Sequence, residues 1–200
     1  MNESINQTFP KAYSRIDEET GSSGFTMPSD PLTGTLLRTL ASSKPAGKFL
    51  ELGTGTGLSA SWILDGMDGR STLISIDNDE AFLAIARQHL ANDKRLTLVL
   101  TDGAKWFGDN QGLKFDFIFA DTWHGKYLLL NEALSMLKPG GLYIIDDMLP
   151  QPNWPDGHAE KVLKLIDDLE RRPDLCLTKQ HWATGIIIAV KKYMNTSKLT

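Results

Sequence analysis

A glycine-rich turn constrains this chain more than any other feature of its sequence. Gly53, Gly55 and Gly57 follow the compact apolar run 48–52 and lead directly into residues 58–64, which have helical character. Glycine lets the backbone turn sharply and approach a ligand closely, and the helix start behind it presents free N–H groups and a partial positive charge. This order of elements predicts a nucleotide-type binding site.

Apolar runs and helical patterns continue to alternate along the chain, as in a parallel sheet with crossover helices. Further strands are expected at residues 71–76, 96–100, 115–120, 142–145, 175–178 and 186–190, and helices at residues 31–40, 58–64, 82–90, 127–138 and 158–171. Too few residues separate the last two strands for a crossover helix, so we expect them to pair as an antiparallel hairpin at the sheet edge. The predicted fold class is α/β, a Rossmann-like, doubly wound sheet of seven strands, mostly parallel, with helices on both faces.

One domain accounts for this pattern. Of the 200 residues, 41% are hydrophobic and 23% are charged, which is typical of a globular chain with a buried core. We divide the chain into a polar N-terminal lead-in (residues 1–24), a single domain (residues 25–193) and a C-terminal tail (residues 194–200).

Charge and cysteine content exclude several classes of protein. The 21 Lys and Arg are interleaved with 25 Asp and Glu, whereas binding to nucleic acid needs a basic stripe. Apolar runs such as residues 186–190 are far shorter than the ~20 residues that cross a bilayer, and the polar start of the chain does not have the pattern of a secretory signal. Cys176 is the only cysteine, which excludes an internal disulfide and a cysteine zinc site. We expect a cytoplasmic protein that acts on a small molecule, binds neither nucleic acid nor a membrane, and could form a homodimer.

The spacing of the glycines decides which nucleotide is favoured. A dinucleotide site has the pattern G-x-G-x-x-G, but here Leu58 stands three residues after Gly55, which disfavours a NAD-dependent dehydrogenase. Asp77 follows the second predicted strand, where a carboxylate can accept both hydroxyls of a ribose. A strand-end turn residue or a cap of the next helix is the alternative role of Asp77.

Residues 51–57 resemble motif I of the class I S-adenosylmethionine-dependent methyltransferases, and Ile76 with Asp77 resembles the acidic position that follows that motif. The likeness continues through residues 115–121 and 137–147 and covers roughly residues 25–190. Among these families the chain is most similar to the O-methyltransferases of the catechol and caffeoyl-CoA type. The resemblance implies a methyltransferase whose cofactor is S-adenosylmethionine.

The same resemblance implies which residues hold the cofactor. Glu51 and the backbone of the glycine turn would face its methionine part, Asp77 its ribose, and Asp102 with the two following residues its adenine edge. After Ala104 the chain departs from the family pattern, because Lys and Trp stand where the family has polar residues. The complete expected set is Glu51, Gly53, Thr54, Gly55, Gly57, Ser59, Asp77, Asn78, Asp102, Gly103, Ala104 and Asp121.

Three aspartates follow predicted strands, at the edge where open parallel sheets place their sites. Asp121 comes after the fourth strand, and Asp146 and Asp147 come after the fifth. Carboxylates suit Mg²⁺ or another divalent cation, and the resemblance implies Mg²⁺ held by an Asp after strand four and an Asp-Asn pair after strand five. Asp147 replaces that Asn. The side chains of Asp146 and Asp147 can reach one ion only if the strand ends before them, because adjacent side chains of a strand point to opposite faces. The alternative is that Asp147 caps a turn before Pro150.

The segment after Asp121 resembles the family segment in which a catalytic Lys stands three positions after the Asp ligand, and His124 takes that position here. An imidazole with an ordinary pKa of about 6.5 can act as a general base. We therefore predict His124 and Asp121 as catalytic residues. A solvent-exposed His124 is the alternative, and Lys126 is a less favoured base.

Trp123, Trp154 and Met27 are expected to line the site of a flat acceptor, since loops after strands usually set specificity. Met27 belongs to residues 26–28, which resemble the segment that closes over the cofactor, and a structural turn with Met27 in the core is the alternative. We expect His158 to be a surface or capping residue.

The favoured function is a divalent-metal-assisted O-methyltransferase acting on a small, hydroxylated, catechol-like molecule. In that mechanism the ion binds two substrate oxygens and His124 accepts the proton before in-line attack on the sulfonium methyl. The alternatives are a metal-independent class I methyltransferase acting on another nucleophile, and a non-catalytic protein that binds S-adenosylmethionine.

Overall fold

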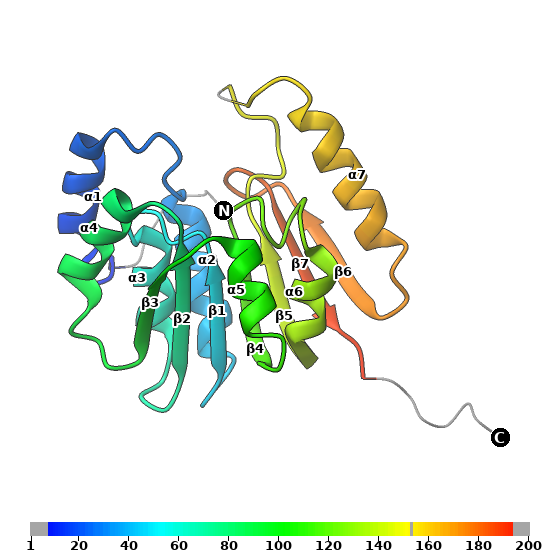
Figure 1. The fold of residues 1–200 in the computed structure, drawn as a ribbon, viewed down its shortest axis with the longest axis horizontal. Helices are drawn as coiled ribbons and strands as arrows, with labels where there is room; N and C mark the ends of the chain where they lie inside the picture. Colours follow the sequence, from blue (N-terminus) through cyan, green and yellow to red (C-terminus); the bar gives the residue numbers. More distant parts are fainter. Residues whose placement is uncertain (1–7, 153, 194–200) are drawn as a thin grey trace.

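One seven-stranded sheet lies at the centre of the structure, a computed structural model that describes residues 8–152 and 154–193. The strand order is β3-β2-β1-β4-β5-β7-β6 (Figure 1). The strands are β1 (Lys48–Leu52), β2 (Thr72–Asp77), β3 (Leu96–Leu100), β4 (Phe115–Ala120), β5 (Leu137–Ile145), β6 (Leu175–Gln180) and β7 (Ile186–Lys191). Strand β7 is antiparallel to β5 and β6, and the other neighbours pair in parallel. The predicted sheet with its C-terminal hairpin is confirmed.

Helices cover both faces of this sheet. They are α1 (Tyr13–Ser23), α2 (Pro31–Ser42), α3 (Leu58–Gly66), α4 (Glu80–Leu90), α5 (Gly103–Asp109), α6 (Leu130–Met136) and α7 (His158–Glu170). Buried side chains of α1, α2 and α3 and Leu90 of α4 belong to one hydrophobic cluster, and those of α5, α6 and α7 belong to the other.

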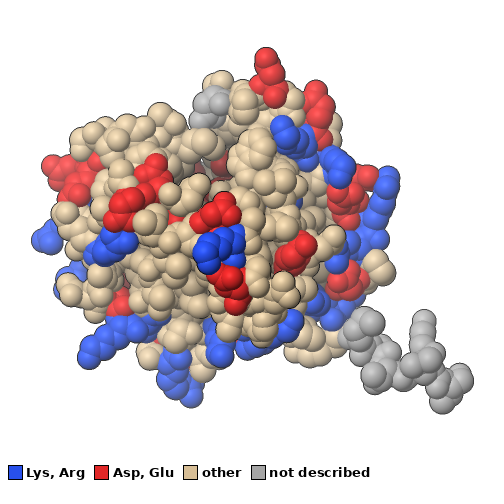
Figure 2. All heavy atoms as spheres, viewed as in Figure 1, with Lys and Arg blue, Asp and Glu red and all other residues tan. Residues whose placement is uncertain are grey.

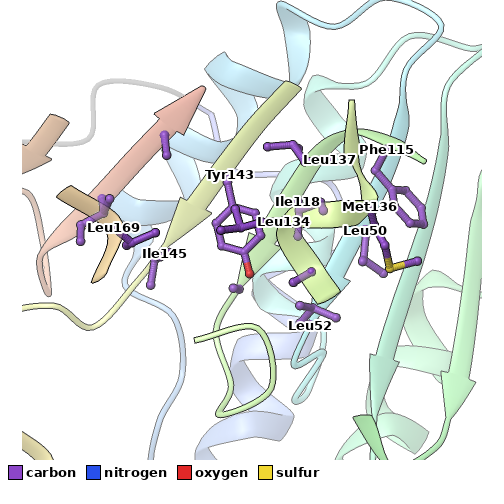
Figure 3. Packing of buried hydrophobic residues seen from close by; sticks show 14 of the residues in the cluster. Leu50, Leu52, Phe115, Ile118, Leu134, Met136, Leu137, Tyr143, Ile145 and Leu169 are labelled. Carbon is purple, nitrogen blue, oxygen red and sulfur yellow. The ribbon is translucent and has the colours of Figure 1, made fainter. Parts of the chain in front are cut away.

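The side chains of β4 show why helices must cover both faces of the sheet. Phe117 and Phe119 belong to the cluster of α1–α4, whereas Ile118 and Ala120 belong to the cluster of α5–α7. Successive side chains of a strand point to opposite faces, so a strand that is apolar at each of these positions must be buried on both. Figure 3 shows part of the second cluster, in which Tyr143 of β5 packs with Leu134 of α6.

The predicted polar lead-in of residues 1–24 contains helix α1. Tyr13 and Ile16 of this helix are buried in the cluster of α1–α4. Thr20 is buried as well; its hydroxyl donates to Ile16 O at 2.7 Å, and its Oγ1 lies 2.7 Å from Thr56 Oγ1. These three residues lie on one face over two helical turns, and they pack α1 against the domain. In the sequence they form only a weak pattern, because the surrounding segment is polar.

The region between β4 and β5 differs from the sequence prediction. The helix expected over residues 127–138 is shortened to α6, because Leu129 adopts a left-handed conformation with φ 56° before it and β5 begins at Leu137 after it. Pro139 therefore lies within β5, where the pairing with β4 shifts register between Phe115 and Phe117. A proline donates no hydrogen bond, and such an irregularity tolerates it. Helix α5 was not predicted.

The order of the strands positions the site. Strand β1 leads into α3 on one face of the sheet and its neighbour β4 leads toward α6 on the other face, so the loops after β1 and β4 diverge. Ligands of open α/β sheets bind in the crevice that opens at such a point, beyond the carboxyl ends of the strands.

Charged side chains of both signs are interleaved over the face that Figure 2 presents. Within the described residues, no helix is long and apolar enough to cross a membrane. The compartment and the homodimer stay predictions.

Candidate active site

A cavity of about 300 Å³ lies beyond the ends of β1 and β4. It is lined by the glycine turn, the end of β2, the loop after β4 and the segment before α2. A smaller cavity of about 120 Å³ shares Asp121 and Asp147 with it. Of the predicted site residues, those lining the larger cavity are Met27, Gly53, Thr54, Gly55, Ser59, Asp77, Asn78, Asp121, Trp123, Asp147 and Trp154.

The glycine turn is held by hydrogen bonds to the end of β2. The N–H groups of Gly53 and Thr54 both donate to Ile76 O, at 3.0 and 3.1 Å. The Gly55 N–H donates to Asp77 Oδ2 at 2.7 Å. Because these N–H groups have protein partners, they are not free to cradle a phosphate, which agrees with the glycine spacing in disfavouring a pyrophosphate site.

Gly57 serves packing and does not line the cavity. It precedes α3 with φ 96°, and a Cβ at this position would lie 2.9 Å from Cβ of Ala86 on α4. A residue with a side chain would be strained in this conformation and would push α3 and α4 apart. The third glycine of the turn thus brings a helix close, whereas the first two line the cavity.

Glu51 lies beneath the turn and is fully buried. Ser75 Oγ donates to its Oε2 at 2.5 Å, and Ser75 Oγ also lies 2.6 Å from Thr54 Oγ1. Burial raises the pKa of Glu51 to about 8, with smaller contributions from the charges of Asp121 and Asp77, while hydrogen bonds from Ser59 and Ser75 lower it. Glu51 is therefore largely protonated at neutral pH, and it contacts the turn through Ser75.

The three residues predicted for the adenine edge do not line the cavity. Asp102 is the N-cap of α5, where its side chain accepts from the Lys105 N–H at 3.0 Å. The His124 ring packs on Gly103, since a Cβ there would lie 2.6 Å from ring atoms of His124. Among the described residues that line the cavity, His124 is absent and Lys126, from the same loop, is present.

Four lining residues had no clear signal in the sequence. Phe25 and Phe82 form a ring pair with centroids 4.7 Å apart. Thr56 is tied to α1 by the hydrogen bond between its hydroxyl and that of Thr20, and the Ser29 hydroxyl donates to Asp121 Oδ2 at 3.1 Å. Each of these contacts joins the N-terminal segment to α4, to the glycine turn or to the residue after β4, so they depend on long-range folding.

The three strand-end aspartates lie close enough to influence one another. Burial and then the charge of Asp121 raise the pKa of both Asp146 and Asp147, and the charge of Lys126 lowers both. Strand β5 stops at Ile145 and Asp147 turns with φ 56°, so the backbone does change direction here, as a shared ion would require.

The trio does not form a divalent-cation site of the predicted kind. Oδ1 of buried Asp146 accepts from Thr184 Oγ1 at 2.5 Å and from the Asp147 N–H at 2.8 Å, and Asp146 lines neither of the two cavities. The Lys126 Nζ lies 3.4 Å from Asp121 Oδ1. No group of three or more His, Cys, Asp or Glu side chains suited to a metal ion occurs within residues 8–152 and 154–193. The Mg²⁺ prediction is therefore not supported.

An aromatic wall forms the far side of the cavity, made of Trp123, Tyr127, Trp154 and His158. The ring centroids of Tyr127 and His158 are 5.2 Å apart, and those of Trp154 and His158 are 4.5 Å apart. The Tyr127 hydroxyl lies 3.0 Å from His158 Nε2. Burial raises the pKa of Tyr127 to about 12, so its phenol stays protonated.

His158 is buried, which corrects the expectation of a surface or capping role. Burial lowers its pKa, and the positive charges of Lys126 and Lys161 lower it further. Its Nδ1 is buried without a hydrogen-bond partner among the described residues. The imidazole is therefore neutral near pH 7.

Comparisons with known proteins find similarity to methyltransferases. A family described as methyltransferase domain matches residues 50–148. A protein of Mycobacterium avium named as an O-methyltransferase is 27% identical over 122 residues, which are 58% of this chain and 54% of that protein. A trans-aconitate 2-methyltransferase of Delftia acidovorans is 30% identical over 128 residues, 62% of this chain and 44% of the relative. The matched part spans about half the length of these curated relatives.

Two solved structures show the same fold. The O-methyltransferase from Bacillus cereus, in complex with S-adenosylhomocysteine, superimposes with a TM-score of 0.82 at 18% identity over 94% of each chain. An O-methyltransferase of Streptomyces achromogenes involved in tomaymycin synthesis, in complex with S-adenosylmethionine, has a TM-score of 0.78 at 20% identity and covers 94% of this chain and 93% of its own.

The doubly wound sheet that ends in an antiparallel hairpin is the fold that this chain shares with these two solved methyltransferases. Residues 50–148 match a methyltransferase domain, and the similar proteins named above include O-methyltransferases.

Proposed function

We propose that this chain transfers the methyl group of S-adenosylmethionine to an oxygen of a small, flat, hydroxylated acceptor such as a catechol-like ring. One observation carries the proposal: a single cavity is lined both by the glycine turn with Asp77 and by Trp123, Tyr127 and Trp154. Cavities with aromatic walls and few polar groups suit flat small molecules. The two O-methyltransferase structures solved with cofactor or product support the choice of methyl donor.

In this proposal the cofactor lies along the turn. Gly53, Thr54, Gly55 and Ser59 are near its methionine part, while Asp77 and Asn78 bind the ribose. The rings of Phe25 and Phe82 pack beside the adenosine. The carboxylate of Asp121 favours the cationic sulfonium by its negative charge.

The acceptor oxygen attacks the methyl carbon in line with the carbon–sulfur bond. Its electron pair forms the new carbon–oxygen bond, and the broken bond leaves its electrons on sulfur, which gives neutral S-adenosylhomocysteine. The acceptor proton passes to the neutral imidazole of His158, whose Nε2 lies 3.0 Å from the Tyr127 hydroxyl and whose Nδ1 has no hydrogen-bond partner among the described residues. His158 takes the role that the sequence assigned to His124, because His158 lines the cavity.

Methyl transfer from labelled S-adenosylmethionine to a panel of dihydroxybenzenes tests the proposal. We expect a methylated oxygen, binding of S-adenosylhomocysteine in calorimetry, and a raised KM for the acceptor in Trp154→Ala without weaker cofactor binding. Cofactor binding with no product from any acceptor favours the non-catalytic alternative. Product only on nitrogen or sulfur nucleophiles favours the alternative methyltransferase.

A further inference from the structure

Lys126 brings a positive charge into the cavity that the acceptor is proposed to enter. Its side chain is 5% exposed, and its Nζ lies 3.4 Å from Asp121 Oδ1. A buried ammonium is stable only beside opposite charge. Lys126 is therefore a buried, ion-paired residue of the site and not a surface lysine.

The loop that carries Lys126 is firmly anchored. The N–H groups of Lys126, Tyr127 and Leu128 all donate to Trp123 O. The hydroxyl of buried Tyr143 donates to Gly125 O at 2.6 Å, and a Cβ on Gly125, whose φ is 89°, would lie 2.5 Å from Leu52. The loop is thereby locked against β1 and β5, and Lys126 stays in the cavity while these contacts hold.

The positive charge of Lys126 disfavours the predicted divalent ion at this site. Asp121 and Asp147 are the two carboxylates of the trio that line the cavity, since Asp146 bonds to Thr184. The Lys126 ammonium is the counter-charge of these carboxylates, because it lies 3.4 Å from Asp121 Oδ1 and its charge lowers the pKa of Asp147. A divalent cation placed there would meet a like charge in a buried site, where such repulsion is weakly screened.

We propose that the Lys126 ammonium takes the place of a divalent cation and holds the reacting oxygen of the acceptor by a hydrogen bond. An ammonium has three N–H donors, and the contact with Asp121 uses one. Its charge stabilises the negative charge that develops on the acceptor oxygen as the proton leaves for His158. Methyl transfer then needs no divalent ion. The contact with the acceptor rests on the proposed function, whereas the missing affinity for divalent cations does not.

Titration with Mn²⁺, followed by electron paramagnetic resonance, tests the inference without an acceptor. We expect the wild type to bind no Mn²⁺ at this site up to millimolar concentration. Lys126→Met leaves Asp121 and Asp147 without their counter-charge, so this variant should gain a Mn²⁺ site, which the further change Asp147→Asn removes. Lys164→Met is the matched control, because it removes an exposed lysine paired with Asp168 on α7 and should behave like the wild type.

A wild-type Mn²⁺ site that Asp147→Asn abolishes overturns the inference, and so does turnover that EDTA stops and Mg²⁺ restores. If circular dichroism shows that Lys126→Met does not fold, the wild-type titration still decides, together with Lys126→Arg, which keeps the charge and should bind no Mn²⁺. Failure of the proposed function has a different signature: S-adenosylhomocysteine does not bind, or no acceptor is methylated, whatever the Mn²⁺ titration shows.

Discussion

The backbone N–H of Gly55 donates a hydrogen bond of 2.7 Å to Oδ2 of Asp77. The other carboxylate oxygen, Oδ1, accepts from the Asp79 N–H at 2.9 Å. Asp77 is therefore held in one orientation against the glycine turn. The ribose-binding and methionine-binding parts of the proposed cofactor site form a single rigid unit before any ligand arrives.

Asp77→Ala should weaken binding of S-adenosylhomocysteine about 10- to 100-fold, because hydrogen bonds to a charged group contribute about 1.5–3 kcal/mol. Isothermal titration calorimetry measures the change. Asp102→Asn is the control, since Asn caps a helix as well as Asp does and residue 102 does not line the cavity. Equal losses in both variants would give Asp102 the adenine-edge role that the sequence indicates.

His158→Gln tests the assignment of the proton acceptor. A base must be neutral, so kcat/KM should fall as the pH drops through the pKa of His158, which burial and then Lys126 and Lys161 hold below the usual 6.5. The variant should lose that acidic limb and about 10²- to 10⁴-fold in kcat. In His124→Gln the limb should persist. If it persists in His158→Gln and disappears in His124→Gln, the sequence assignment of His124 is restored.

Tyr143→Phe should lower the free energy of unfolding by about 1–3 kcal/mol, because it leaves the Gly125 carbonyl without its buried donor. The loop that carries Lys126 should loosen, so kcat should fall more than the affinity for S-adenosylhomocysteine. Urea unfolding and calorimetry measure the two effects. Tyr193→Phe, at an exposed tyrosine, is the control and should leave stability within about 0.5 kcal/mol. An unchanged stability in Tyr143→Phe would show that water replaces the hydroxyl.

Glu51→Gln should reduce the dependence of stability on pH. The folded state raises the pKa of Glu51 from 4.5 to about 8, so unfolding between these pH values releases a proton. For one such group, the free energy of unfolding falls with rising pH by about 1.4 kcal/mol per pH unit. Glutamine stays neutral and lacks this loss. Urea unfolding at several pH values between 5 and 8 measures the free energy of unfolding. In Glu51→Gln this free energy should fall less steeply with pH than in the wild type or in the control Glu80→Gln, at an exposed position. Equal pH dependence in all three proteins contradicts the burial argument.

Gly34→Ala tests the contact between α2 and α3. A Cβ on Gly34 would lie 2.3 Å from the indole of Trp62, so the added methyl group should destabilise the chain by about 1–3 kcal/mol. Gly21→Ala is the matched change in α1, where no atom lies within 4 Å of the new Cβ, and it should stabilise by up to about 1 kcal/mol. Thermal unfolding of the two variants gives the signs, and a stable Gly34→Ala would mean that Trp62 moves aside.

Local patterns in the sequence were sufficient for most of the sheet. The predicted strands at Lys48–Leu52, Leu96–Leu100 and Phe115–Ala120 agree with β1, β3 and β4 residue by residue. Buried strands of a parallel sheet are apolar runs closed by glycine or acidic residues, so their signal is local. Helix α1 and the start of β5 were missed because their conformation depends on contacts with distant parts of the chain.

The sequence by itself determined the order of the elements, the antiparallel hairpin and the pairing of the glycine turn with the acid after β2, because periodicity and spacing are properties of neighbouring residues. Only the tertiary structure decided which side chains meet in the cavity. Asp146 bonds to Thr184, 38 residues away, and Tyr127 to His158, 31 residues away. Such contacts turn one carboxylate away from the cavity and bring one imidazole into it, and no local pattern encodes them.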